Sequence, residues 1–125
     1  MSTYAEPAVS ARVADAELIV WPLPEDSVID GSPDARGAVL SRSDDSRIIR
    51  GMWECTPGQF KWSFSYDETL VVVSGSATVE LDTGERVELS PGTMAFFGRG
   101  HESTWTVHET LRKGFHADSP DPLPF

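Results

Sequence analysis

Most of the chain after residue 37 consists of short segments in which apolar and polar residues alternate. In the clearest of them, Phe60, Trp62 and Phe64 alternate with lysine or serine. A period of two is typical of a β-strand that buries one face. Groups of turn-forming residues, such as residues 56–58 and 90–92, separate the segments. Eight or nine short strands at spacings of about 8–12 residues predict an all-β sandwich or barrel, and no useful helical period follows residue 25. The predicted strands include residues 69–73, 76–81, 101–107 and 109–115.

Both ends of the chain depart from this pattern. Residues 1–17 are small or charged, and we expect them to form an arm that is partly ordered where Ile19, Val20 and Trp21 dock. The last seven residues are spaced by prolines and predict an extended tail that lies along a neighbouring subunit or is disordered. We therefore divide the chain into an N-terminal arm (1–30), a barrel (31–117) and a C-terminal tail (118–125).

Charge and composition limit the partners of this chain. The 125 residues carry 20 acidic and 10 basic side chains, a net charge of −10. Nucleic acids and anionic lipid surfaces require a basic footprint, so we expect neither as a partner. No apolar run approaches the roughly 20 residues that cross a bilayer. Cys55 is the single cysteine, which excludes an internal disulfide and favours a cytoplasmic location.

Two stretches resemble the signatures of a known family. Residues 58–75 contain Glu68, which is followed by six residues and then by Gly75 at the end of the stretch. Residues 90–103 carry the spaced glycines of a second motif. Together they resemble the two signatures of the cupin family. Further residues, 53–58, 62, 96–97 and 105–113, resemble the short cupins grouped with the cupin domain of (S)-ureidoglycine aminohydrolase. The resemblance extends from Gly31 to His116 and implies a single jelly-roll β-barrel, but it implies no reaction.

The same resemblance implies four metal-ligand positions, and only one of them keeps a ligand. Glu68 is present, but the three histidine positions hold Trp62, Phe64 and Ser103. None of these replaces an imidazole as an ordinary ligand. We therefore expect no metal and no other cofactor.

A displaced metal site made from the three histidines of the chain was the alternative. His101 and His108 have opposite parity on a continuous strand, so they would need a bulge between them to face one ion. His116 lies at the far end of the next predicted strand. This geometry disfavours a shared ion.

Glu68 and a group of aromatic residues are the candidate site. Burial would raise the pKa of Glu68 toward neutrality and suit it to general acid–base catalysis, whereas the structural alternative is a carboxylate paired with a backbone amide, Lys61 or an arginine. Either Arg112 or Lys113 should face inward by alternation. The residues expected to bind a ligand are Trp53, Trp62, Phe64, Tyr66, Phe97, Ser103 and Trp105. Mixed aromatic walls suit a ligand pocket, although such side chains also fill small barrels.

These features give three functional hypotheses. The first is an enzyme that uses Glu68 on a small polar metabolite such as an amide, a ureide or a sugar-like molecule. The second is a non-catalytic module that binds or senses a metabolite. The third is an interaction scaffold with a fully packed barrel. We also expect a homodimer, because exposed strand edges are usually covered in β-proteins.

Overall fold

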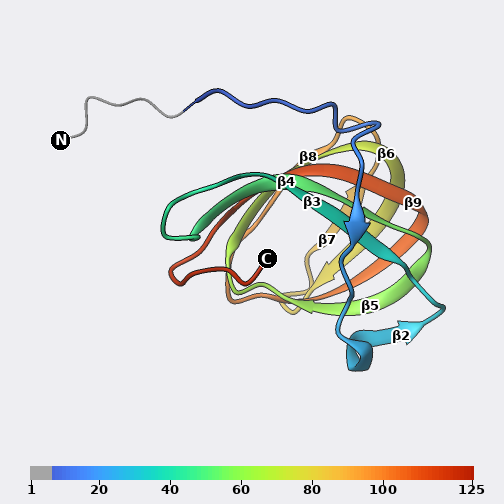
Figure 1. Cartoon of the computed structure of the whole chain (residues 1–125). Coiled ribbons are helices and arrows are strands. Elements are labelled where there is room, and N and C mark those ends of the chain that lie inside the picture. Colours follow the sequence, from blue (N-terminus) through green and yellow to red (C-terminus); the bar gives the residue numbers. More distant parts are fainter. Residues whose placement is uncertain (1–6) are drawn as a thin grey trace.

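A computed structural model describes residues 7–125, and its regular secondary structure consists almost entirely of strands (Figure 1). One short 3₁₀ helix, η1 (Glu25–Ser27), precedes the barrel. The strands are β1 (Ile19–Val20), β2 (Val28–Asp30), β3 (Ala35–Arg42), β4 (Ile48–Cys55), β5 (Gly58–Ser63), β6 (Asp67–Leu81), β7 (Arg86–Leu89), β8 (Met94–Phe97) and β9 (Glu102–Asp118). The described part of the chain contains no helix that is long and apolar enough to cross a bilayer.

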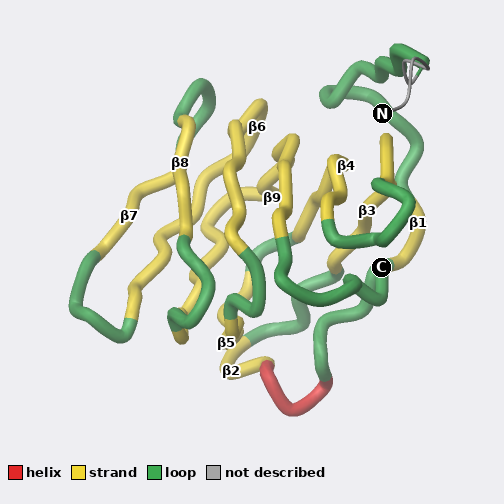
Figure 2. The backbone as a smooth tube through the Cα atoms, turned by 90° about the vertical axis from the view of Figure 1, so that its left-hand side faces the viewer, coloured by secondary structure: helices red, strands yellow, loops and turns green. Residues whose placement is uncertain are grey.

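The strands form one antiparallel sheet that curls on itself. Its hydrogen-bonded order is β1-β3-β4-β9-β5-β2, and β6 pairs with β9 and also with β7 and β8. Figure 2 shows the strands side by side, from β7 and β8 at one end to β3 and β1 at the other. The long strand β9 thus connects both halves of the structure. This arrangement confirms the predicted all-β, jelly-roll barrel.

The predicted division of the two longest strands was wrong. The sequence suggested separate strands at residues 69–73 and 76–81, and again at 101–107 and 109–115. The structure joins each pair into one strand, β6 and β9, which bend without separating. The register between them shifts at three points between Val72 and Ala77. Gly75 lies there with φ +82°, and it lets the strand bend at a bulge while pairing continues on both sides.

Alternation along the strands builds the core. In β9 the odd-numbered residues are buried over most of its length, including Trp105, Val107 and Leu111. Nine large side chains are almost completely buried, namely Phe60, Phe97, Ile49, Leu70, Leu89, Leu111, Val72, Val79 and Cys55. Burying a side chain of the size of leucine or phenylalanine contributes about 1.5–3 kcal/mol each. The predicted half-buried strands are therefore confirmed by the faces that they bury.

The N-terminal arm docks where the sequence suggested. Ile19 and Val20 form β1 and pair with Gly37 and Arg36 of β3. The ring of Trp21 lies directly on Gly37, where an added Cβ would come within 2.1 Å of it. Residues 1–6 of the predicted arm lie outside the described residues.

The C-terminal tail folds back on its own barrel, unlike the neighbouring-subunit or disordered tail that we expected. The Ser119 amide donates a hydrogen bond to the Arg47 carbonyl, and the Leu123 amide donates one to the Ser46 carbonyl, each at 2.8 Å. Leu123 is buried, and in Figure 1 the C-terminus lies inside the ring of strands in this view. Apolar residues at the end of the tail anchor it, and the proline spacing alone did not reveal this.

Candidate ligand pocket

The barrel contains a cavity of about 50 Å³. A water molecule needs roughly 10–15 Å³ of such volume, so the cavity holds a few waters or one small organic molecule. Its walls are mostly aromatic: they consist of Trp21, Pro22, Leu23, Trp53, Phe60, Trp62, Tyr66, Glu68, Trp105, Lys113, Phe115 and Phe125. The scaffold hypothesis required a completely packed barrel, and this barrel contains a cavity.

Cross-strand pairing brings the aromatic walls together. Phe60 of β5 lies opposite Trp105 of β9, and their rings stack at 6.1 Å with an interplanar angle of 11°. Trp53 of β4 meets the same indole edge-on at 6.1 Å. Aromatic pairs of this kind contribute about 0.5–1.5 kcal/mol beyond the area that they bury. They hold the flat walls of the cavity in place.

An ion pair supplies the polar part of the pocket. The Lys113 Nζ atom lies 2.5 Å from the Glu68 Oε2 atom, and the two side chains are only 7% and 4% exposed. The ammonium group also lies over three rings, 4.7 Å from the centroid of Trp53, 5.0 Å from that of Trp105 and 5.7 Å from that of Phe115. Lys113 faces Trp53 directly across the β4–β9 ladder. The pocket thus contains one negative and one positive group, and the two charges balance.

Tyr66 adds a neutral hydroxyl to the wall. Burial, and then the neighbouring Glu68 charge, raise the pKa of the Tyr66 phenol well above its ordinary value. The phenol therefore stays protonated at physiological pH and can donate or accept a hydrogen bond.

The two ends of the chain cover the mouth of the pocket. Trp21 packs against Phe125 with ring centroids 5.0 Å apart, and Phe125 in turn contacts Tyr66 at 5.8 Å. Trp21 also meets Phe115 edge-on at 6.3 Å. These contacts make both ends of the chain part of the pocket wall.

The structure brings together five of the predicted site residues. Trp53, Trp62, Tyr66, Glu68 and Trp105 all line the cavity. The sequence predicts these five residues as parts of one site. In the structure they come from β4, β5, β6 and β9, with Tyr66 just before the start of β6.

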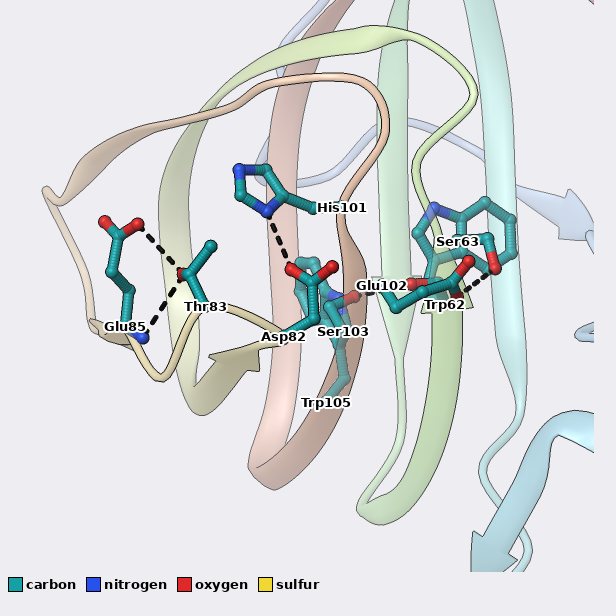
Figure 3. Close-up of polar contacts among 9 residues, drawn as sticks. All are labelled: Trp62, Ser63, Asp82, Thr83, Glu85, His101, Glu102, Ser103 and Trp105. Carbon is teal, nitrogen blue, oxygen red and sulfur yellow. Dashed lines mark hydrogen bonds and ion pairs between the residues drawn. The ribbon is translucent and has the colours of Figure 1, made fainter.

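Three predicted residues lie elsewhere. Phe64 and Phe97 stack on each other in the core at 5.1 Å and do not line the cavity. Ser103 donates a hydrogen bond from its Oγ to the Trp62 carbonyl at 2.7 Å and accepts one from the Trp105 Nε1 at 3.2 Å (Figure 3). Its proton is already used, so Ser103 positions two walls of the pocket and does not offer a hydrogen bond to a ligand at the position we expected.

Seven of the twelve residues that line the pocket were not among the predicted site residues. Lys113 was considered only as one of two basic residues that alternation would turn inward, and its partner was not identified. The shared odd parity of Trp105, Lys113 and Phe115 on one strand was the available signal. Trp21 and Phe125 carried no such signal, because their positions depend on how the two ends of the chain fold back.

Glu54, a second acid on a predicted strand, and Cys55, the single thiol, could also carry chemistry, but structural contacts account for both. Glu54 pairs with the Arg112 guanidinium at 3.1 Å, and Arg112 also donates to the carbonyls of Val13 and Ala16, so this pair fixes the N-terminal arm. Burial raises the pKa of the Cys55 thiol to about 12. Cys55 is therefore a packing residue and no nucleophile at neutral pH.

The side chains inside this barrel do not fit a metal ion. The positions that the family resemblance gives to histidines hold two aromatic rings and the hydrogen-bonded Ser103, and the carboxylate of Glu68 is paired with Lys113. The Nδ1 of His101 contacts Asp82 at 2.9 Å, and the Nε2 of His108 contacts Thr78 at 2.8 Å. Across residues 7–125, no three histidine, cysteine or carboxylate side chains converge to hold an ion.

An antiparallel jelly-roll barrel is the architecture of cupins and of several other protein classes. Residues 42–115 match the profile of the EutQ-like cupin domain family. The match covers more than half of the chain, which therefore belongs to that family.

Several solved structures share this fold. A protein of unknown function of the DUF861 family from Pseudomonas syringae pv. tomato is 22% identical with a TM-score of 0.74, over 82% of this chain but 44% of that protein. A putative ethanolamine utilization protein Q from Salmonella typhimurium is 21% identical with a TM-score of 0.62, over 70% and 72% of the two chains. The EutQ protein of Clostridium difficile is 26% identical with a TM-score of 0.63, over 72% and 66%. The comparison with curated proteins gave no match.

Proposed function

We propose that this chain binds a small, neutral, polar organic molecule inside the barrel, in the size range of a simple amide or ureide. The observation that supports it is a partly open aromatic cavity with one buried ion pair at its wall. Ligand sites of proteins are typically apolar and aromatic cavities with a few polar groups that orient the ligand, and barrel mouths are a preferred location.

Each part of the pocket has a role in this recognition. Indole faces stack on a planar ligand, the Lys113 ammonium donates to its carbonyl oxygen, and the Glu68 carboxylate accepts from its N–H groups. The pair is electrically balanced, so a charged ligand would leave one charge uncompensated in an apolar site. The net charge of −10 further disfavours anionic ligands.

Catalysis is the second candidate, and the contact between Glu68 and Lys113 favours it. A proton acceptor and a proton donor meet at 2.5 Å in a cavity that admits few waters, which is an arrangement suited to proton transfer to a bound molecule. Substituting Glu68→Gln separates the two functions. Catalysis requires that turnover is lost while binding is kept, and an unchanged rate excludes an acid–base role.

Binding is tested directly with acetamide and N-methylurea as probes. We expect both to change the fluorescence of the pocket tryptophans and to shift their indole N–H signals in NMR spectra. Lys113→Met should weaken the effect by about tenfold or more, because the ligand carbonyl loses its charged donor. Lys61→Met is the matched control, since Lys61 is exposed, and it should change nothing. Equal responses in all three proteins, or none in any, would refute the proposal.

The narrower placement among cupins is part of the same proposal. The residues at 53–58 and 105–113 support the branch grouped with (S)-ureidoglycine aminohydrolase, and a ureide would suit the neutral pocket. The activity itself does not transfer, because three of the four ligand positions carry no metal ligand. A cytoplasmic location also stays a prediction, resting on a single buried thiol.

We further propose a homodimer formed through the outer face of β8. This strand pairs only with β6 among the described residues, so its other edge is open. Its side chains Met94 and Phe96 are 70% and 63% exposed, although both are apolar. An open strand edge with apolar side chains is usually covered in native proteins. Light scattering should give the mass of two chains and Phe96→Lys should reduce it to one, whereas a one-chain mass for the unmodified protein would exclude the dimer.

A further inference from the structure

The chain contains two lysines in very different surroundings. Lys61 is exposed on β5, whereas the Lys113 amine lines the cavity beside a carboxylate and three aromatic rings. Nothing in simple binding requires an amine at this position, because a hydroxyl or an amide would also donate to a ligand carbonyl. A primary amine differs from those groups in that it can form a covalent bond with a carbonyl carbon.

We propose that Lys113 captures small neutral aldehydes in this cavity as a reversible imine. The inference rests on the proposed function, because the aldehyde must first enter the pocket. Lysine amines in protein pockets form such bonds with carbonyl ligands, and here a carboxylate lies beside the amine to accept its proton. The aldehyde carbonyl would occupy the position that the carbonyl of a neutral ligand takes beside Lys113.

The proton balance of the step needs only Lys113 and Glu68. Glu68 takes one proton from the ammonium, and the free Nζ electron pair attacks the carbonyl carbon, which opens the C=O double bond. The resulting carbinolamine oxygen receives two of the three original ammonium protons, one of them returned by Glu68, and leaves as water. The product is a protonated imine, so aldehyde and ammonium become iminium and water with no net change in protons or charge.

The ion pair stabilises the starting ammonium and the iminium product alike, so it does not oppose the overall equilibrium. The Glu68 carboxylate and the rings of Trp53 and Trp105 stabilise a cation at the Lys113 nitrogen. The iminium product is also a cation at the same nitrogen, so it keeps these interactions. The neutral amine exists only during the attack, when Glu68 holds the proton nearby.

The dimensions and charge of the cavity define the class of aldehyde. A volume of about 50 Å³ limits the ligand to a few heavy atoms unless the mouth opens. Glu68 already balances the only cation in the described cavity wall, so an aldehyde that carries a carboxylate or phosphate would bring an unpaired charge. Short uncharged aliphatic aldehydes satisfy both limits.

The experiment traps the imine with propionaldehyde and cyanoborohydride and measures labelling of each lysine by peptide mass spectrometry. In the folded, unmodified protein we expect Lys113 to be labelled about tenfold faster than Lys61 or more, which corresponds to about 1.4 kcal/mol in activation free energy. Exposure alone predicts the reverse order, because Lys61 is the accessible lysine. In urea the two rates should become equal, and Lys113→Arg should remove the fast label while leaving Lys61 labelling unchanged.

Propionamide, which has the same shape and forms no imine, separates this inference from the proposed function. Binding of propionamide together with a Lys113 that is labelled no faster than Lys61 overturns the imine and leaves the pocket proposal standing. Absence of both propionamide binding and Lys113 labelling overturns both. Rapid labelling of Lys113 in the folded protein supports the imine whether or not propionamide binds.

Discussion

Removing both members of the buried ion pair should destabilise the fold by less than the sum of the two single removals. The perturbation is a double-mutant cycle with Lys113→Met, Glu68→Gln and the combined variant. Both side chains are less than a tenth exposed, so solvent screens their interaction little. Breaking a buried pair costs about 3–5 kcal/mol, because the remaining charge lies in an apolar site without a partner.

The structure predicts which single variant suffers more. Without Glu68, the Lys113 ammonium still lies over three aromatic rings, and such contacts are worth up to about 2 kcal/mol when desolvated. Without Lys113, the Glu68 carboxylate faces ring surfaces whose negative quadrupole repels it. We therefore expect about 3–5 kcal/mol for Lys113→Met and about 2–3 kcal/mol for Glu68→Gln. The double variant should fall short of their sum by about 2–3 kcal/mol, since no unpaired charge is left.

Urea denaturation followed by tryptophan fluorescence and circular dichroism measures these differences. Lys61→Met serves as the surface control and should lie within about 0.5 kcal/mol of the unmodified protein. An additive double variant would show that the two groups do not interact as the geometry implies. A larger loss for Glu68→Gln than for Lys113→Met would refute the role assigned to the aromatic rings.

Three further predictions follow from single residues. The raised pKa of Tyr66 should make the free energy of unfolding fall as the pH rises above 10.0, the ordinary pKa of a tyrosine. Above that pH the Tyr66 phenol ionises in the unfolded chain but stays protonated in the folded protein. Tyr66→Phe should remove that part of the fall in alkaline urea titrations. Cys55, with a pKa of about 12, should not react with Ellman's reagent in the native protein at neutral pH, and fast native reaction would contradict its burial. Gly75→Ala should lower the free energy of unfolding by about 2 kcal/mol or more, because the added Cβ would lie 1.9 Å from the Thr110 carbonyl oxygen at a residue with φ +82°. Gly84 also has a positive φ, +90°, but an added Cβ there meets no neighbouring atom, so Gly84→Ala should cost less in the same urea assay.

Local pattern in the sequence predicted the all-β class and most of the strands, and the resemblance to cupins narrowed the fold to a jelly-roll barrel. Alternation identifies which face of a strand is buried, and the turn residues between segments limit where strands end. Alternation did not predict the continuity of β6 and β9. In the sequence, a bulge inside one continuous strand looks the same as the end of one strand followed by the start of another. The difference depends on whether the partner strand also continues, which is a property of the sheet and not of the segment.

The candidate site was predictable only in part for a related reason. Strand parity gave the inward direction of Trp53, Trp62 and Trp105, and these residues do line the cavity. Parity also turned Phe64 and Ser103 inward, but it does not tell how deep along the barrel a side chain lies or which neighbour takes its hydrogen bond. The contact between Glu68 and Lys113 joins residues 45 positions apart and appears only once β6 and β9 are in register.

The position of Lys113 explains how a carboxylate can remain buried in this barrel. A carboxylate deep in an apolar interior requires a countercharge, and in cupins that hold a metal the ion can provide it. Here the chain provides it from its own strand β9, opposite Trp53, with an ammonium that the surrounding rings also stabilise. A metal offers open coordination positions to a ligand, whereas an ammonium offers N–H donors and, after losing a proton, an electron pair. The non-histidine residues at positions 62, 64 and 103 and the presence of Lys113 both support our proposals of ligand binding by hydrogen bonds and of amine chemistry in this cavity.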